Sequence, residues 1–153
     1  MSKNVVIFVL IGLLAVSQFF LWRATGSTAT SEPEAEPELA AYMGDMQRYL
    51  HKLQLAIRAG NVEVAKFYLH ELEEVSGEVI DNVGTYEGYA IGSLTQQMLM
   101  PEIERLEGSI QSGDEAIDSV DRMMGVCNAC HVATDHDFIV IDWPRENPYN
   151  QRF

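Results

Sequence analysis

Apolar residues recur at steps of three and four positions in four stretches of the chain, which is the spacing of one buried helix face. The pattern predicts helices over about residues 38–59, 61–80, 94–110 and 114–131. The stripe of the first helix consists of Leu39, Met43, Met46, Leu50, Leu53 and Ile57. Val62 begins the stripe of the second helix, and Ile117 begins that of the fourth. Because the connections between the stretches are short, we expect an all-α chain folded as an antiparallel four-helix bundle.

Residues that begin or end helices separate the four stretches. Asn61 can cap the second helix, and Asp114 can cap the fourth. Three glycines predict a loop over residues 81–93. Pro101 lies inside the third helix and should kink it or mark a restart, because proline has no N–H to donate. Residues 135–153 follow the last helix and are expected to form an extended tail that packs on the bundle.

The first 38 residues differ in composition from the predicted bundle. Val5 to Trp22 is a run of eighteen residues without a charge, and as a helix it would be about 27 Å long, close to the thickness of a bilayer's hydrocarbon core. The run is longer than the core of a signal peptide, and no Ala-x-Ala cleavage site follows it. We therefore predict a single transmembrane anchor, or an uncleaved signal, at residues 1–23 and a Glu/Pro-rich linker at residues 24–38.

The remaining part of the chain is strongly acidic. Four of the 23 Asp and Glu residues and two of the ten Lys and Arg residues precede residue 39, which leaves 19 acidic against 8 basic side chains. Nucleic acid and an anionic membrane face are therefore not expected as partners. A surface of this sign either steers the protein toward a basic docking patch on another protein or serves only solubility.

Both cysteines of the chain lie in the segment Cys127-Asn128-Ala129-Cys130-His131. This spacing is typical of c-type haem attachment, in which two thiols add across the haem vinyl groups as thioethers and the adjoining imidazole ligates the iron. Three other interpretations stay open: a redox-active thiol pair, a zinc site with His131 and His136, and a plain disulfide. The first lacks a neighbouring βαβ pattern, the second needs two adjacent side chains on one metal, and the third leaves His131 without a role.

With this motif near the end of its last helix, the predicted bundle resembles cytochrome c′ and its low-spin, methionine-ligated relatives. The likeness covers residues 39–134 in architecture, but only Cys-Asn-Ala-Cys-His is specific in sequence. It implies one covalently attached haem c near one end of the bundle. Cys127 and Cys130 would form the thioethers, and His131 would be the proximal ligand of the iron.

A methionine is expected on the other face of the haem. In an antiparallel bundle the end of the fourth helix lies beside the start of the first helix, where Met43 and Met46 lie on the inner stripe. The first helix also resembles that of the b-type four-helix cytochromes, in which a methionine near this point ligates the iron. We expect Met43 to be the distal ligand, with Met46 as the alternative.

The resemblance implies an electron carrier: a membrane-anchored monohaem c-type cytochrome that passes electrons between redox partners. Bacteria attach c-type haem outside the cytoplasmic membrane, so a single-pass anchor would place the haem domain on the periplasmic side. The expected partners are redox proteins with a basic patch, and the chain could be a subunit of a membrane complex or a dimer. Two alternatives stay open: a five-coordinate haem protein that binds NO or CO, and a structural subunit stapled by its haem. No nucleophile–base set, phosphate loop or paired-carboxylate motif indicates an enzyme.

Overall fold

The part of the chain that the structure describes is helical. A computed structural model of the protein describes residue 18, residues 39–112 and residues 116–153. Its elements, in order, are α2 (Leu39–Arg58), α3 (Val62–Asn82), α4 (Ile91–Leu94), the π-helix η1 (Thr95–Leu99), α5 (Met100–Ser112) and α6 (Ala116–Ala133). These residues contain no strand, only an isolated antiparallel bridge between Tyr86 and Tyr89. The prediction of an all-α fold is therefore confirmed for them.

The predicted anchor at residues 1–23 and the predicted linker at residues 24–38 lie outside the described residues, apart from Gln18. The same holds for the predicted N-cap Asp114. Among the helices that are described, none combines the length and the apolar character needed to cross a membrane. The bundle and the C-terminal residues belong to one compact unit, Glu36–Phe153.

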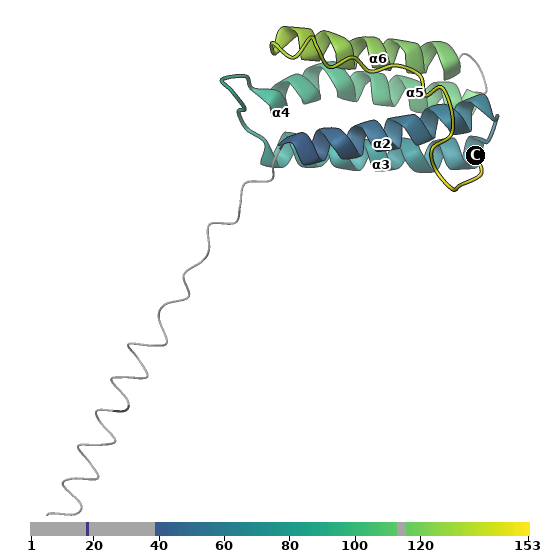
Figure 1. Cartoon of the computed structure of the whole chain (residues 1–153), viewed down its shortest axis with the longest axis horizontal. Helices are drawn as coiled ribbons and strands as arrows, with labels where there is room; N and C mark the ends of the chain where they lie inside the picture. The colour runs from purple at the N-terminus through teal and green to yellow at the C-terminus, as the bar shows by residue number, and fades with distance from the viewer. Residues whose placement is uncertain (1–17, 19–38, 113–115) are drawn as a thin grey trace, which may run out of the picture. The chain divides into compact units, whose positions relative to one another are not determined.

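The four long helices lie side by side, and consecutive helices run in opposite directions (Figure 1). Helix α2 contacts α3, α3 contacts α5, α5 contacts α6, and α6 returns to α2. This arrangement brings the start of α2, the end of α3 and the end of α6 to the same end of the bundle (Figure 1). Residues 39–46 and 127–133, which are far apart in the sequence, therefore meet at that end.

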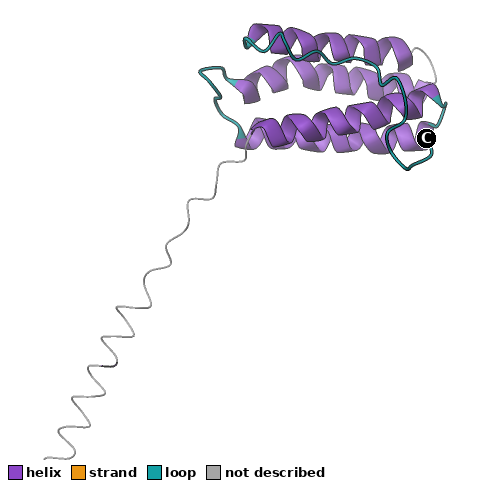
Figure 2. Cartoon of the chain, viewed as in Figure 1, coloured by secondary structure: helices purple, strands orange, loops and turns teal. Residues whose placement is uncertain are grey.

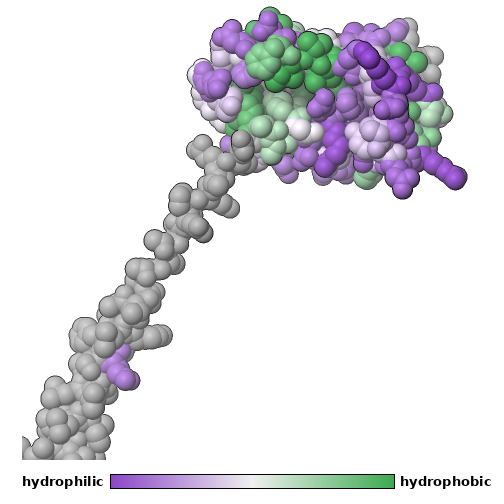
Figure 3. All heavy atoms as spheres, viewed as in Figure 1, coloured by the Kyte–Doolittle hydropathy of each residue, from purple (hydrophilic) through white to green (hydrophobic). Residues whose placement is uncertain are grey.

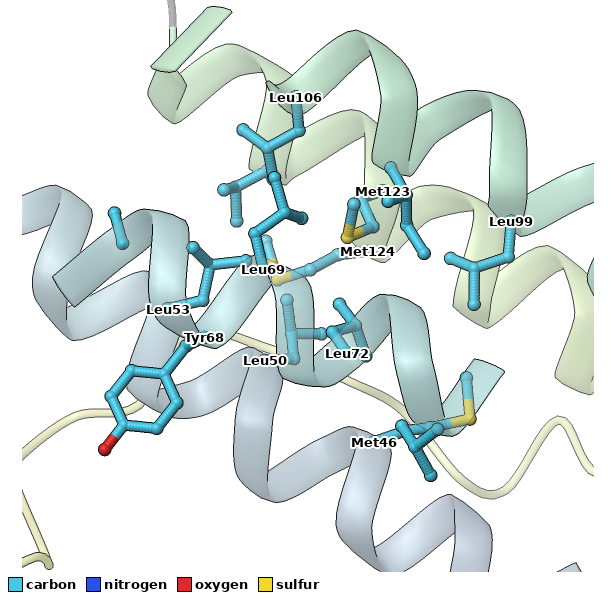
Figure 4. Close-up of a cluster of buried hydrophobic side chains, with 14 of the residues drawn as sticks. Met46, Leu50, Leu53, Tyr68, Leu69, Leu72, Leu99, Leu106, Met123 and Met124 are labelled. Carbon is cyan, nitrogen blue, oxygen red and sulfur yellow. The ribbon is translucent and has the colours of Figure 1, made fainter. Parts of the chain in front are cut away.

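The core is formed by the inner faces of the helices (Figure 4). Leu50 and Leu53 of α2, Leu72 of α3, Leu106 of α5 and Met123 of α6 are all buried. Such burial of apolar side chains is the main driving force for folding. The stripes of the sequence predict most of these inner faces, but they overestimate burial at two helix starts.

Two residues assigned to the inner stripes are exposed instead. Val62 is 42% exposed and Ile117 is 51% exposed. Val62 is the first residue of α3, and Ile117 is the second residue of α6. Periodicity alone does not report how far a neighbouring helix extends, so it overestimates burial in a first turn.

The connection between α2 and α3 is built as the sequence predicts. Gly60 has a φ of 69°, in the left-handed region that glycine adopts without strain. The Oδ1 atom of Asn61 accepts a hydrogen bond from the Val64 N–H at 3.3 Å, which caps α3. The chain therefore reverses direction in three residues, and α3 packs against α2.

The loop after α3 is shorter than predicted, because Ile91, Gly92 and Ser93 are helical. Gly92 donates its N–H to the Val83 carbonyl at 3.1 Å. A Cβ atom at Gly92 would lie 2.8 Å from the Val83 oxygen and 2.9 Å from the Ile80 oxygen. Glycine is therefore needed here for close packing of α4 against the end of α3. The prediction of a loop over residues 81–93 is wrong at residues 81–82, which belong to α3, and at residues 91–93, which belong to α4.

The predicted irregularity at Pro101 takes the form of a π-helical turn just before it. The N–H of Met100 donates to the Thr95 carbonyl, five residues back. Pro101 has no N–H, so the chain cannot continue the regular bonding pattern through this position. The third long helix thus restarts at Met100, and η1 inserts one wide turn between α4 and α5.

Residues 134–153, called the tail below, form neither helix nor strand and run back along the bundle (Figure 2). The Nη1 atom of Arg58 donates to the Pro144 carbonyl at 3.0 Å, and its guanidinium lies 4.2 Å from the centre of the Trp143 ring. The Tyr68 hydroxyl, which points away from the core in Figure 4, donates to Gln151 Oε1 at 2.7 Å. These contacts fix the second half of the tail to α2 and α3.

Candidate functional site

A cavity of about 330 Å³ lies at the end of the bundle where α2 begins and α6 ends. Its volume is within the range of pockets that hold small molecules and cofactors. Its walls come from α2, α3, α4, η1, α6, the loop between α3 and α4, and the tail. Most of the lining is apolar, and Leu39, Leu50, Leu72 and Leu99 contribute to it.

All five residues that the sequence singles out for the haem site line this one cavity. Cys127, Cys130 and His131 lie on the last turns of α6, while Met43 and Met46 lie on the first turns of α2. Met46 is 9% exposed and belongs to the core, whereas Met43 is partly buried beside it. The two cysteines are partly buried and are not joined to each other. The structure thus brings together the residues expected to hold the iron and the porphyrin.

His131 is oriented by the tail. Its Nδ1 atom lies 2.8 Å from the carbonyl oxygen of Ile139. A carbonyl oxygen can only accept, so Nδ1 carries a proton, and in the neutral ring Nε2 is the nitrogen that keeps its lone pair. Histidines that ligate metals usually hold their other ring nitrogen in this way. The imidazole is therefore in the tautomer that a proximal ligand needs.

Asn128, between the two cysteines, holds the same part of the tail. Its Nδ2 atom donates to the Ile141 carbonyl at 3.0 Å, and its Oδ1 atom accepts from the Ile141 N–H at 2.7 Å. This two-point contact places Ile139 and Ile141 in the wall of the cavity. Sequence reasoning missed this role of Asn128. The only available signals were its place inside the motif and the apolar run Phe138–Ile141, which follows the motif closely.

The two thiols are in an environment that keeps them protonated. Burial raises the pKa of Cys127 to about 11, and the neighbouring Cys130 adds to the shift. Burial also raises the pKa of Cys130. Reactive thiol pairs depend on a lowered pKa, and zinc requires thiolates. Among the described residues, moreover, no group of three or more His, Cys, Asp or Glu side chains is arranged to hold a metal ion. The raised pKa values disfavour the thiolate form that a reactive thiol pair or a zinc site would need.

Tyr89 and His136 also line the cavity, and of these two the sequence singles out only His136. The hydroxyl of Tyr89 donates to Asp135 Oδ2 at 2.5 Å, which ties the α3–α4 loop to the tail and raises the pKa of Tyr89. His136 Nδ1 lies 2.6 Å from the Thr134 carbonyl, and its Nε2 lies 3.8 Å from a carboxylate oxygen of Glu87. Both ring nitrogens of His136 therefore have polar neighbours in the protein, and the Glu87 carboxylate beside Nε2 makes His136 a less suitable metal ligand than His131.

Comparison with known proteins adds no family to these observations: no protein-family model, no curated protein and no solved structure matches the chain. The basis for a function is therefore the chemistry of the cavity itself. It combines two protonated thiols at helical spacing, an imidazole with one free lone pair, two thioethers and an apolar wall.

Proposed function

We propose that the cavity holds one haem c and that the protein is an electron carrier. Cys127 and Cys130 would form the two thioether bonds, and His131 would ligate the iron through Nε2. Met43 would be the distal ligand, with Met46 as the alternative. The observation that carries the proposal is that all five side chains line a single apolar cavity, with the His131 tautomer held by the Ile139 carbonyl.

The residues of the chain would act as follows. Each thiol would add its S–H across a vinyl group of the haem, with sulfur bonding to one vinyl carbon and the hydrogen to the other. The resulting thioethers would have no titratable proton. They would stay uncharged in the apolar cavity, whereas burial penalises the ionised form of the free Cys127 thiol. A methionine thioether is a soft ligand that favours Fe(II), and the apolar wall disfavours the extra charge of Fe(III). When bound, the haem iron supplies reversible one-electron chemistry.

The same proposal places the domain on the periplasmic face of a bacterial cytoplasmic membrane. It rests on the apolar run within residues 1–23, the Glu/Pro-rich residues 24–38 and the site of c-type haem attachment. Redox proteins with a basic docking patch are the proposed partners, because the formal charge of the chain is −13.

Production of the full chain in a cell that attaches c-type haem tests the proposal. We expect its mass to increase by one haem, and this increase to disappear when Cys127 and Cys130 are both changed to Ala. The ferric spectrum should be low-spin and should become high-spin in Met43→Ala, whereas Met46→Ala keeps it low-spin. Met98→Ala, a partly buried methionine outside the cavity lining, is the control. A chain that carries zinc, or no haem, would contradict the proposal.

A five-coordinate haem that binds NO or CO is the second candidate. It is favoured by the apolar lining from Leu50, Leu72 and Leu99, because small neutral ligands enter such a distal pocket. In that case a chain with both Met43→Ala and Met46→Ala would keep the high-spin spectrum of the unchanged chain. The reduced protein would also bind CO rapidly, without displacement of an internal ligand.

A further inference from the structure

An exposed apolar surface covers the outer side of the cavity wall. Phe138 is 76% exposed, Val140 is 69% exposed and Val132 of α6 is 62% exposed. In the tail these residues alternate with Ile139 and Ile141, which line the cavity. Figure 3 shows hydrophobic surface gathered on this face over α6 and the first part of the tail. Apolar side chains held outward in this way usually mark a place where another molecule binds.

Carboxylates surround this apolar centre. Asp135 and Asp137 precede the segment 138–141, Asp142 follows it, and all three are exposed. Glu87 reaches the same region from the α3–α4 loop, since its carboxylate lies 3.8 Å from the His136 ring in the tail. An apolar centre with a charged rim is the ordinary anatomy of a protein–protein interface.

We propose that this surface is the docking site for a redox protein whose own docking face has an apolar centre and a rim of Lys and Arg. The surface, called the tail surface below, consists of Val132, Phe138 and Val140 with the four carboxylates around them. Residues 123–144 contain no Lys or Arg, so within this segment the charged side chains next to the apolar centre are all acidic. The nearest cations are Arg122 and Arg145 at its two ends and Arg58, which packs on Trp143. The inference rests on the proposed haem in the cavity.

The position of the tail surface also suits electron transfer. The imidazole of His131, the proposed iron ligand, bonds to the Ile139 carbonyl at 2.8 Å. Ile139 is joined directly to Phe138 and Val140, the two most exposed apolar residues of the tail. One hydrogen bond and a few covalent bonds thus connect the proposed ligand to the tail surface, and a partner docked there would lie close to the cofactor.

Other occupants fit the charges less well. A second copy of this chain would bring the same four carboxylates against themselves, and an anionic membrane would repel them. At low salt, like-charge repulsion weakens both of these associations, whereas attraction between opposite charges strengthens the association with a basic partner. Charge therefore selects a basic redox protein.

Electron transfer from the haem-loaded full chain to a basic mitochondrial cytochrome c, followed by stopped-flow absorbance, tests the inference. A variant with Phe138→Ser and Val140→Ser should lower the second-order rate constant about tenfold at every salt concentration. A variant with Asp135→Asn, Asp137→Asn and Asp142→Asn should lower it about tenfold at low salt. At high salt the latter loss should disappear, because exposed charges are screened.

Matched controls come from exposed residues outside the tail surface. Phe67→Ser removes an aromatic ring that is 54% exposed on α3. A variant with Glu63→Gln, Glu104→Gln and Glu107→Gln removes the same number of exposed charges from α3 and α5. Both control variants should change the rate constant by less than about twofold.

The outcomes separate the inference from the proposed function. Haem-loaded variants with unchanged rates, or controls that lose as much as the tail variants, would overturn the docking site and leave the electron carrier standing. A dimer in sedimentation that dissociates in the Phe138→Ser, Val140→Ser variant would replace the redox partner by a second copy. A chain that never acquires haem would overturn the proposed function and the inference with it.

Discussion

His131 donates Nδ1–H to the Ile139 carbonyl, and this carbonyl is held in place because Asn128 binds the backbone of Ile141 at two points. Asn128, Ile141 and Ile139 thereby determine which nitrogen of the His131 ring keeps its lone pair. A partner of this kind fixes the tautomer and the orientation of a metal-binding histidine. The spacing of Cys127, Cys130 and His131 is visible in the sequence, but the group that orients His131 is not, since a backbone carbonyl has no sequence signature.

Asn128→Ala should therefore affect His131 as well as stability. It removes two hydrogen bonds, each with a contribution of about 1 kcal/mol to the free energy of unfolding. In the haem-free chain, the ring nitrogens of His131 should lose the signals of a single tautomer, as measured by ¹⁵N NMR. Asn82→Ala, at an exposed position at the end of α3, is the control and should leave these signals unchanged. Unchanged His131 signals in Asn128→Ala would show that the tail does not orient the ring.

Among the helices, α4 depends on a close backbone approach. The Cβ atom of an alanine at position 92 would lie 2.8 and 2.9 Å from two carbonyl oxygens of the α3 end, and neither oxygen can rotate away. We expect Gly92→Ala to lower the free energy of unfolding by about 1–3 kcal/mol, as overpacking does. Because Ile91 lines the cavity, the shift of α4 should also alter the cavity. Urea unfolding and the haem spectrum measure the two effects.

Gly108→Ala provides the matched control within the same run of helix. Gly108 lies in the interior of α5, and a Cβ atom there would meet nothing within 4 Å. Alanine is a better helix former than glycine, so this change should raise the free energy of unfolding by about 0.5–1 kcal/mol. Equal effects of the two substitutions would mean that helix propensity, and not the approach to α3, governs position 92.

Local sequence patterns predict where the helices of this fold lie far better than they predict the contacts between the helices. The stripes locate α2, α3, α5 and α6, and Asn61 is recognisable as a cap, because such signals span only one or two helical turns. The sequence predicts Gly92 to be a loop residue, because its role in close packing depends on its contact with α3. The antiparallel order correctly brings Met43 near the end of α6, because topology alone decides which helix ends meet.

At the scale of the whole molecule, the tail joins the cavity to the opposite end of the bundle. It leaves α6 beside His131, passes Asn128, and ends near Tyr68, which bonds to Gln151. Its position could not be predicted, because side chains more than eighty residues away in the sequence hold its second half. The first half forms the cavity wall, and the second half only anchors it.

Two truncations separate these roles. A chain that ends at Trp143 loses the bonds of Pro144 and Gln151 to the bundle but keeps Ile139 and Ile141 in the cavity wall. A chain that ends at Asp137 also loses the three hydrogen bonds that join the tail to Asn128 and His131. At about 1 kcal/mol for each bond, both chains should be less stable to urea than the full chain.

Hydrogen exchange of the backbone amides in the last two turns of α6 should distinguish the two truncated chains. In the chain that ends at Asp137, we expect these amides to exchange at least about tenfold faster than in the chain that ends at Trp143, because the local opening energy falls by more than 1.4 kcal/mol. Amides in the middle of α3 are the internal control and should differ little between the two. Equal exchange at the end of α6 would mean that the tail covers the cavity without stabilising the helix that carries Cys127, Cys130 and His131.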